Sequence, residues 1–144
     1  MARYPSILRV RFVLVSIIVL ITSQSAHSVT RECPIEGFNY EIIEQSARDA
    51  PSCQRAFELF RLCNSGAGGD VGVGAAVTER CESEFISTLS KIERQTYRGA
   101  QNRCARKYRH ETGTMYRSFE AFCGAEVAFS FAKRAVQRAA RKRP

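Results

Sequence analysis

The stretch from Thr78 to Phe131 decides the fold of this chain, and its sequence is TERCESEFISTLSKIERQTYRGAQNRCARKYRHETGTMYRSFEAFCGAEVAFSF. Apolar or small residues recur at every third or fourth position on both sides of Thr112-Gly113-Thr114. This spacing is typical of one buried face of an α-helix, and a glycine followed by threonine is typical of a turn and a helix N-cap. The stretch therefore predicts two long helices that fold back on each other at Gly113.

Both limbs of this predicted hairpin carry an apolar face. The first limb is expected over residues 77–110, with Thr78 as its N-cap. Its predicted buried stripe is Val77, Cys81, Phe85, Leu89, Ile92, Thr96, Ala100 and Cys104. The predicted inward residues of the second limb are Met115, Phe119, Phe122, Cys123, Val127, Ser130 and Phe131. A buried phenylalanine contributes roughly 1.5–3 kcal/mol, so we expect these rings to dominate the core.

Shorter helices are predicted ahead of the hairpin. Residues 40–50 form one, and Pro51 in a first turn starts another that runs to Cys63. Five glycines fall within residues 64–74 without the pattern of a phosphate-binding loop, which predicts a flexible connector. We therefore expect an all-α fold, a small disulfide-stapled helical bundle built on a long antiparallel helical hairpin.

Residues 1–28 have the pattern of a secretory signal peptide. Three arginines precede a ten-residue apolar run, and Ala26-His27-Ser28 fits the small-x-small cleavage rule. About 20 apolar residues are needed to cross a bilayer, so the run is too short for a membrane anchor. The expected order is a signal peptide (1–28), a helical disulfide-containing domain (29–132) and a basic C-terminal tail (133–144).

The formal net charge of +8 is unevenly distributed. The predicted leader carries +3 and the tail +6, so residues 29–132 carry −1. A nearly neutral body without a stacking platform or a known motif argues against nucleic-acid binding. The basic tail is the part suited to an anionic membrane, because each basic residue near such a surface contributes about 1 kcal/mol.

All six cysteines follow the predicted leader, and an even number predicts three disulfides in an oxidising compartment. We therefore expect the protein in the periplasm of a Gram-negative bacterium or secreted. Cys104 and Cys123 stand nine and ten residues from Gly113, so an antiparallel hairpin brings them level and predicts their bond. The remaining expected pairs are Cys63 with Cys81, across the glycine-rich segment, and Cys33 with Cys53.

The sequence predicts no catalytic residue, no cofactor and no metal ligand. Zinc sites use cysteines or histidines separated by two to four residues, whereas no two cysteines here are closer than ten positions. His110 is the one histidine after the leader, and no serine or cysteine joins it in a nucleophile motif. We therefore expect a binding protein and not an enzyme.

The hairpin resembles a known family. A cysteine near the end of one helix, then Gly113-Thr114-Met115, then a helix with Cys123 and Glu126, is similar to the bacterial lysozyme-inhibitor LprI-like family. The upstream spacing Cys53-x₂-Ala56-x₆-Cys63 also resembles the opening cysteine pair of that family, and the similarity covers residues 52–138. The chain has no tryptophan, and Tyr97 and Ala100-Gln101 stand where the family has Trp and an Arg-Asp pair.

The resemblance implies an exported helical binding protein that inhibits a lysozyme or another envelope-directed protein. Lysozymes of the c-type are cationic, so acidic side chains are expected to meet such a target. The candidate partner-binding residues are Glu79, Glu82 and Glu84. The alternative function is that of an envelope-associated structural protein whose basic tail contacts anionic lipid.

Overall fold

The computed structural model of the chain describes residues 32–142. Within this range the chain forms five α-helices and two short 3₁₀ helices, without a strand. Three disulfides link these elements, so the prediction of an all-α, disulfide-stapled bundle is confirmed. The predicted leader, residues 1–28, lies outside the described residues.

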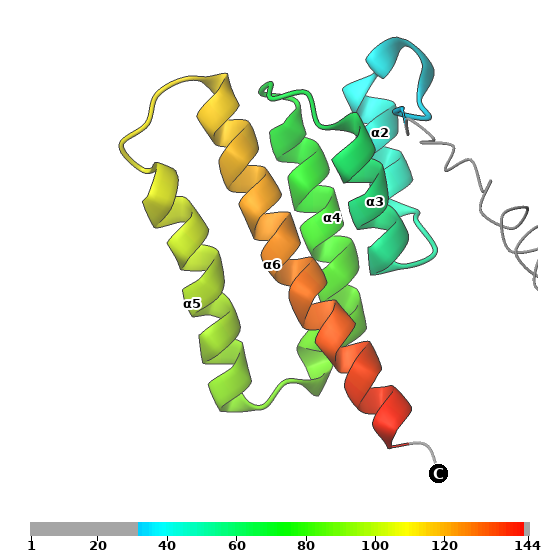
Figure 1. Cartoon of the computed structure of the whole chain (residues 1–144), viewed down its shortest axis with the longest axis vertical. Coiled ribbons are helices and arrows are strands. Elements are labelled where there is room, and N and C mark those ends of the chain that lie inside the picture. Colours follow the sequence, from blue (N-terminus) through cyan, green and yellow to red (C-terminus); the bar gives the residue numbers. More distant parts are fainter. Residues whose placement is uncertain (1–31, 143–144) are drawn as a thin grey trace, which may run out of the picture. The chain divides into compact units, whose positions relative to one another are not determined.

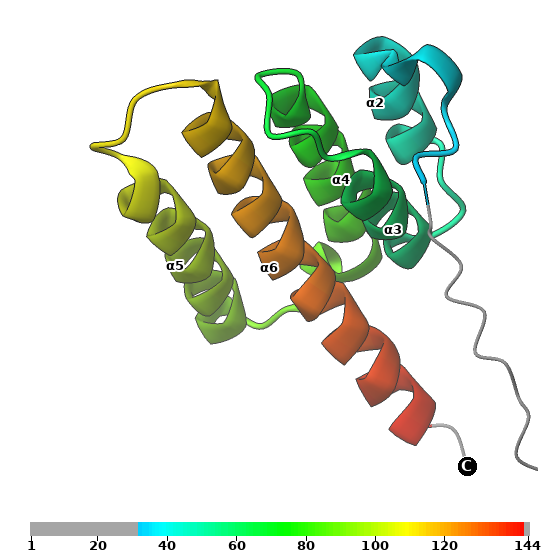
Figure 2. The same cartoon turned by 45° about the horizontal axis from the view of Figure 1, so that its top comes forward.

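The helices follow in the order η1 (Glu36–Phe38), α2 (Tyr40–Arg48), α3 (Cys53–Cys63), α4 (Asp70–Phe85), η2 (Ile86–Thr88), α5 (Lys91–Tyr108) and α6 (Thr114–Arg141). Figure 1 shows α6 between α5 and α4, with α2 and α3 beyond α4, and Figure 2 shows the same order after rotation. α6 packs against α4, α5 and α3, whereas α5 packs chiefly on α6. α5 therefore forms one edge of the bundle.

The core combines small side chains from α6 with larger ones from the other helices. Ser118, Ala125, Ala128 and Ala132 are the buried residues of α6. They face α3 and α4, whose fully buried apolar side chains include Phe60, Val73, Val77 and Phe85. Small residues on one side and larger apolar residues on the other let these helices pack closely.

Side-chain caps determine where three of the helices begin. The Asn39 side chain accepts from the N–H groups of Glu41 and Ile42 at α2, and Ser52 accepts from an N–H of α3. At α5, Ser90 and Glu93 form a capping box, in which each side chain accepts the backbone N–H of the other residue. Such caps satisfy N–H groups that have no partner within the helix.

The first limb of the hairpin is shorter than predicted. A single helix over residues 77–110 is wrong, because α4 ends at Phe85 and α5 begins at Lys91. The capping box of Ser90 and Glu93 starts a new helix, and Ile92 is consequently 75% exposed. Thr96 is also exposed. The antiparallel hairpin of α5 and α6 and its turn at Gly113, which has a φ of 106°, are as predicted.

The glycine-rich segment is only partly a connector. α4 begins at Asp70, so Gly72 and Gly74 are helical and the connector is limited to residues 64–69. Thr78 is therefore not an N-cap. It lies inside α4, where its hydroxyl donates to the carbonyl oxygen of Gly74 at 2.8 Å.

The disulfides join Cys33 to Cys63, Cys53 to Cys81, and Cys104 to Cys123. The predicted Cys104–Cys123 bond is confirmed, and the expected pairs Cys63–Cys81 and Cys33–Cys53 are wrong. Because α4 starts at Asp70, Cys81 lies about 17 Å along its axis at 1.5 Å per residue. Cys81 is therefore distant from the connector that begins after Cys63, and it lies beside the first residue of α3.

Candidate binding site

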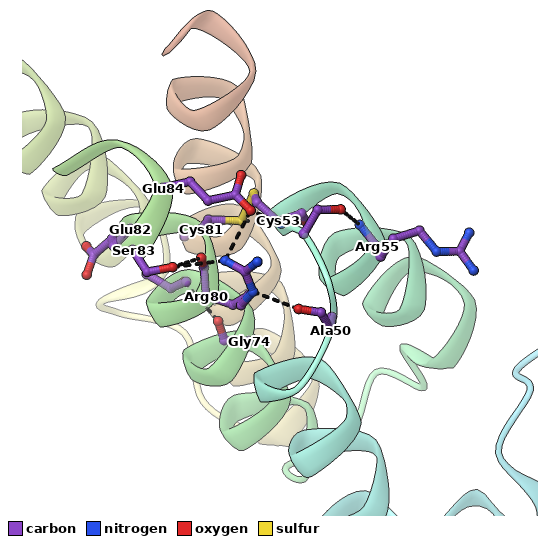
Figure 3. Close-up of a disulfide and its surroundings, with 12 residues drawn as sticks. Ala50, Cys53, Arg55, Gly74, Arg80, Cys81, Glu82, Ser83 and Glu84 are labelled. Carbon is purple, nitrogen blue, oxygen red and sulfur yellow. Dashed lines mark hydrogen bonds and ion pairs between the residues drawn. A yellow bond between two sulfur atoms is a disulfide. The ribbon is translucent and has the colours of Figure 1, made fainter. Parts of the chain in front are cut away.

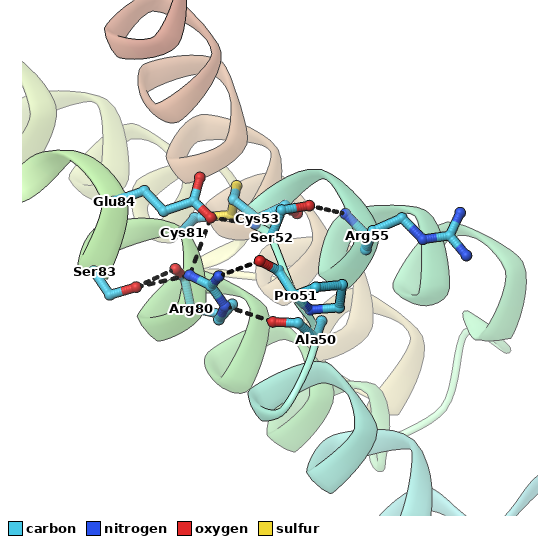
Figure 4. A network of polar contacts seen from close by, with 9 residues as sticks. All are labelled: Ala50, Pro51, Ser52, Cys53, Arg55, Arg80, Cys81, Ser83 and Glu84. Carbon is cyan, nitrogen blue, oxygen red and sulfur yellow. Dashed lines mark hydrogen bonds and ion pairs between the residues drawn. A yellow bond between two sulfur atoms is a disulfide. The ribbon is translucent and has the colours of Figure 1, made fainter.

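The predicted partner-binding residue Glu84 is engaged inside the fold. Its Oε1 accepts the backbone N–H of Cys53 at 2.8 Å and pairs with Arg80 at 3.1 Å, next to the Cys53–Cys81 disulfide (Figure 3). Arg80 also donates to the carbonyl oxygens of Ala50 and Pro51, at 2.8 and 2.9 Å (Figure 4). Glu84 thus joins α4 to the start of α3.

Glu82 has a similar internal role. It accepts a hydrogen bond from the hydroxyl of Tyr97 at 2.7 Å. Burial and this carboxylate together raise the pKa of Tyr97 well above its ordinary value. Gln101 donates both to the Tyr97 hydroxyl, at 2.8 Å, and to the carbonyl oxygen of Gly124, at 3.0 Å. Glu82 therefore belongs to a polar network that joins α4, α5 and α6.

Glu79 alone among the three glutamates presents its carboxylate to solvent, with its side chain 61% exposed. It pairs with Arg48, which also pairs with Glu44 at 2.8 Å, and these hydrogen bonds raise the pKa of Arg48. Glu79 also lines a groove of about 360 Å³ between α4, α5 and α6, together with Arg117 and Glu120. The structure therefore does not bring the three predicted glutamates onto one surface.

A second groove, of about 370 Å³, lies where α3, α5 and α6 meet. It is lined by Arg61, Asn64, Lys107, Tyr108, Phe119, Phe122, Cys123 and Glu126. The ring centroid of Phe119 is 6.1 Å from that of Tyr108 and 6.2 Å from that of Tyr116. Phe119 is 40% exposed, and Met115, one helical turn earlier, is 46% exposed. We call Tyr108, Met115, Tyr116 and Phe119 the aromatic face.

The prediction that Met115 and Phe119 point inward is wrong. At this level of α6 the buried residue is Ser118, and the buried face continues through Ala125, Ala128 and Ala132. With Ala121, these residues recur at every third or fourth position, which is the spacing of a helix face. The small-residue stripe is the signal that could have identified the core side of α6, and the larger apolar residues obscured it.

The aromatic face rests on a rigid base. Phe122 lies in the groove floor and packs against Phe57 and Phe60 of α3, with ring centroids 5.6 and 5.3 Å away. Cys123, also in the groove, is bonded to Cys104 of α5. The core and the disulfide therefore fix the positions of all three helices that form the groove, so a partner meets a preformed surface.

One carboxylate is completely enclosed near this groove. Asp70, at the start of α4, is 0% exposed and accepts from the N–H groups of Ser65, Gly66 and Ala67. It also accepts from the Asn64 amide at 3.2 Å and the Ser118 hydroxyl at 2.6 Å. The connector of residues 64–69 thus folds around Asp70, which ties it to α6.

The charges of the bundle are divided between its two halves. Residues 32–85 contain ten acidic and four basic side chains, a formal charge of −6. Residues 86–142 contain four acidic and thirteen basic side chains, a formal charge of +9. The near neutrality of the body thus conceals an acidic part, from η1 to α4, and a basic part formed by α5 and α6.

Other kinds of site find no support in residues 32–142. No group of three or more His, Cys, Asp or Glu side chains is placed to hold a metal ion within this range. His110 is exposed and follows the end of α5. In the same range, no helix has the length and the apolar character needed to cross a membrane.

Comparisons of the chain with protein-family models, with curated proteins and with solved structures find no match.

Proposed function

We propose that this chain is an exported, non-enzymatic protein that binds a partner protein on its aromatic face. The observation that carries the proposal is the exposure of Phe119 and Met115 beside a preformed groove. Aromatic residues, methionine and arginine are enriched in protein interfaces, and Arg61 is among the residues that line this groove. Three disulfides fit an oxidising environment, which is where an exported protein works.

The side chains that line the groove indicate what kind of partner segment would bind there. Full burial of a phenylalanine or methionine contributes roughly 1.5–3 kcal/mol, and central aromatic anchors carry most of the energy of many interfaces. The lining of the groove includes two cations, Arg61 and Lys107, and one carboxylate, Glu126. A partner segment that fits offers an apolar side chain to Phe119 and an acceptor to the cations.

The resemblance to the LprI-like family makes a c-type lysozyme the first target to test. A cationic lysozyme would be attracted to residues 32–85, which carry −6, because opposite charges raise the rate of encounter. The aromatic face itself belongs to α5 and α6, whose basic charge repels a cationic protein, so this attraction acts on the encounter and not on the bound contact. Glu79 remains a candidate for this encounter because its side chain is 61% exposed.

Inhibition is tested by mixing the purified protein with lysozyme and following the clearing of a cell-wall suspension. We expect the protein to slow clearing, and Phe119→Ser to weaken this effect by about thirtyfold, since an aromatic anchor contributes about 2 kcal/mol. Ile92→Ser is the control, because Ile92 is an apolar residue that is even more exposed than Phe119 (75% against 40%) and lies at the other end of the hairpin, in the first turn of α5. It should inhibit like the unmodified protein.

Two results would overturn this proposal. An unchanged clearing rate at a large excess of protein removes lysozyme as the target. Equal inhibition by the Phe119→Ser and Ile92→Ser variants removes the aromatic face as the binding surface.

A second candidate function is that of an envelope-associated structural protein whose basic tail contacts anionic lipid. It is favoured by the cations Lys133, Arg141 and Lys142, which are exposed near the end of α6. Two other cations of this segment are already engaged, since Arg134 stacks on Phe131 and Arg138 pairs with Glu93. Neutralising the three exposed cations and measuring sedimentation with anionic vesicles tests this function.

A further inference from the structure

α5 carries a continuous basic face along its solvent side. Positions 91, 94, 98, 102, 106 and 109 are spaced by three or four residues and therefore share one side of the helix. They hold Lys91, Arg94, Arg98, Asn102, Arg106 and Arg109, all exposed. We call these six residues the basic face. It extends for about 27 Å at 1.5 Å per residue.

No acidic residue interrupts this face. The only acid within α5 is Glu93, which lies on the side toward α6 and pairs with Arg138. Arg94 uses its Nε to donate to the carbonyl oxygen of Leu89 at 3.1 Å, and the residue as a whole is exposed. Because α5 forms an edge of the bundle, its outer side is not covered by another helix of the described chain.

We infer that the basic face of α5 is a docking surface for an anionic lipid membrane, with the headgroup phosphates as its ligands. Five cations in a row attract a negatively charged surface by long-range electrostatics, which fall off within about 10 Å at 0.1 M salt. This inference concerns a surface separate from the aromatic face, so it does not rest on the proposed protein target.

The composition of the basic face favours lipid over a folded protein partner. A stable protein interface has an apolar, fully desolvated centre, with aromatic anchors surrounded by a polar rim. The six positions of the basic face contain no apolar side chain. Fluid headgroups require no such centre, because they rearrange around fixed cations. Ile92, 75% exposed next to Lys91, adds an apolar side chain that the boundary of a lipid layer accepts.

The test compares two triple variants of equal charge in sedimentation with vesicles of phosphatidylglycerol and phosphatidylcholine. The first is Arg98→Gln with Arg106→Gln and Arg109→Gln, on the basic face. The second is Lys133→Gln with Arg141→Gln and Lys142→Gln, near the end of α6. All six residues are exposed, and all proteins are made from the same full-length sequence, so the segment before residue 32 is identical in each.

We expect the unmodified protein to bind the mixed vesicles at about 0.1 M salt and to be released at about 1 M salt. The variant of the basic face should bind about a hundredfold more weakly, since each cation near the surface contributes about a factor of five. The variant near the end of α6 should retain binding within about threefold. Circular dichroism confirms that each variant is folded.

Five results would overturn the inference. The first is that vesicles containing phosphatidylglycerol do not pellet the unmodified protein, and the second is that phosphatidylcholine vesicles alone bind it equally well. Equal losses in both triple variants would show that net charge and not the basic face governs binding. A larger loss in the variant near the end of α6 would assign binding to the tail. Release from vesicles by double-stranded DNA at equal phosphate concentration would assign the surface to a soluble polyanion.

Discussion

Asp70 determines the shape of the connector between α3 and α4. Its carboxylate is 0% exposed and accepts from three consecutive backbone N–H groups, from Asn64 and from Ser118. Without it these donors would lose their acceptor, at a cost that reaches about 1–3 kcal/mol for a donor that is fully buried, as Ser118 is. The glycines of residues 64–69 allow the chain to turn tightly around the carboxylate, and Gly66 has a φ of 75°.

We predict that Asp70→Ala lowers the free energy of unfolding by about 3 kcal/mol, because the buried Ser118 hydroxyl and several half-buried donors of the connector lose their acceptor together. Denaturant unfolding followed by circular dichroism measures the change. Glu111→Ala, at an exposed position beyond α5, is the control and should change stability by no more than about 0.5 kcal/mol. Equal stability of the two variants would contradict the role of Asp70.

Glu93 makes the start of α5 sensitive to acid. The backbone N–H and the side chain of Ser90, with a further contribution from Arg138, lower the pKa of Glu93 to about 2. The ordinary pKa of glutamate is about 4.3. A folded-state pKa below the unfolded one means that Glu93 stabilises the fold fully above about pH 5 and loses this contribution as the pH falls toward 2.

We therefore predict that Glu93→Gln melts at a lower temperature than the unmodified protein at about pH 6, and that the difference disappears near pH 2. Thermal unfolding across this pH range measures it. A difference that stays constant with pH would show that the charge of Glu93 contributes nothing.

Some contacts of single residues could be predicted from the sequence, and others could not. Cys104 and Cys123 could be paired because they stand nine and ten residues from Gly113 along the chain, on opposite sides of the turn, and the structure contains this bond. The sequence predicts Glu82 and Glu84 on a binding surface, but both carboxylates accept hydrogen bonds inside the fold. Glu82 accepts from the Tyr97 hydroxyl and Glu84 accepts from the backbone N–H of Cys53. Those partners lie 15 and 31 positions away in the chain, so no local pattern could identify them.

At the scale of helices, α4 and α6 meet through a close approach at Gly74. A Cβ added there would lie 2.8 Å from the Cβ and 3.1 Å from the carbonyl oxygen of Ala121. Both atoms belong to a packed helix and cannot move without displacing it. Gly99 of α5 is different, because an added Cβ would meet only the end of the Arg103 side chain, at 3.9 Å.

These two glycines give a matched pair of substitutions. We predict that Gly99→Ala stabilises the protein by about 0.5–1 kcal/mol, since alanine is the better helix former. Gly74→Ala should instead destabilise it by about 1–3 kcal/mol, because overpacking outweighs the gain in helix propensity. The melting temperatures of the two variants, compared with that of the unmodified protein, measure these changes. Stabilisation by both substitutions would contradict the close packing of α4 against α6.

Helix type was predictable in this chain, but helix boundaries were not. The periodic apolar residues correctly indicated helices throughout, whereas the break between Phe85 and Lys91 was missed. Its local signal, Ser90 followed by Glu93, is the pattern of a capping box. The start of α4 at Asp70 could not be predicted from the local sequence, because glycine is a poor helix former. The buried hydrogen bonds of Asp70 and the packing of Gly74 against α6 favour the helix there.

For the whole molecule, the division of charge and the aromatic face together describe how the protein would meet its surroundings. The acidic part, from η1 to α4, carries −6 and the basic part carries +9. This division follows from the sequence, but the placement of α5 on the side of α6 opposite to α4 required the fold (Figure 1). The aromatic face could not be predicted, because Met115 and Phe119 have the same spacing as core residues and only packing shows them to be exposed.

Oxidation of Met115 by peroxide tests the central claim, that a partner binds on the aromatic face, most directly. Met115 is 46% exposed and is the one methionine of residues 32–142, so peptide mass spectrometry reports on that face alone. With lysozyme in excess, we predict that Met115 is oxidised at least about fivefold more slowly than in the free protein, because the bound partner covers it. An unchanged rate of oxidation would contradict the account.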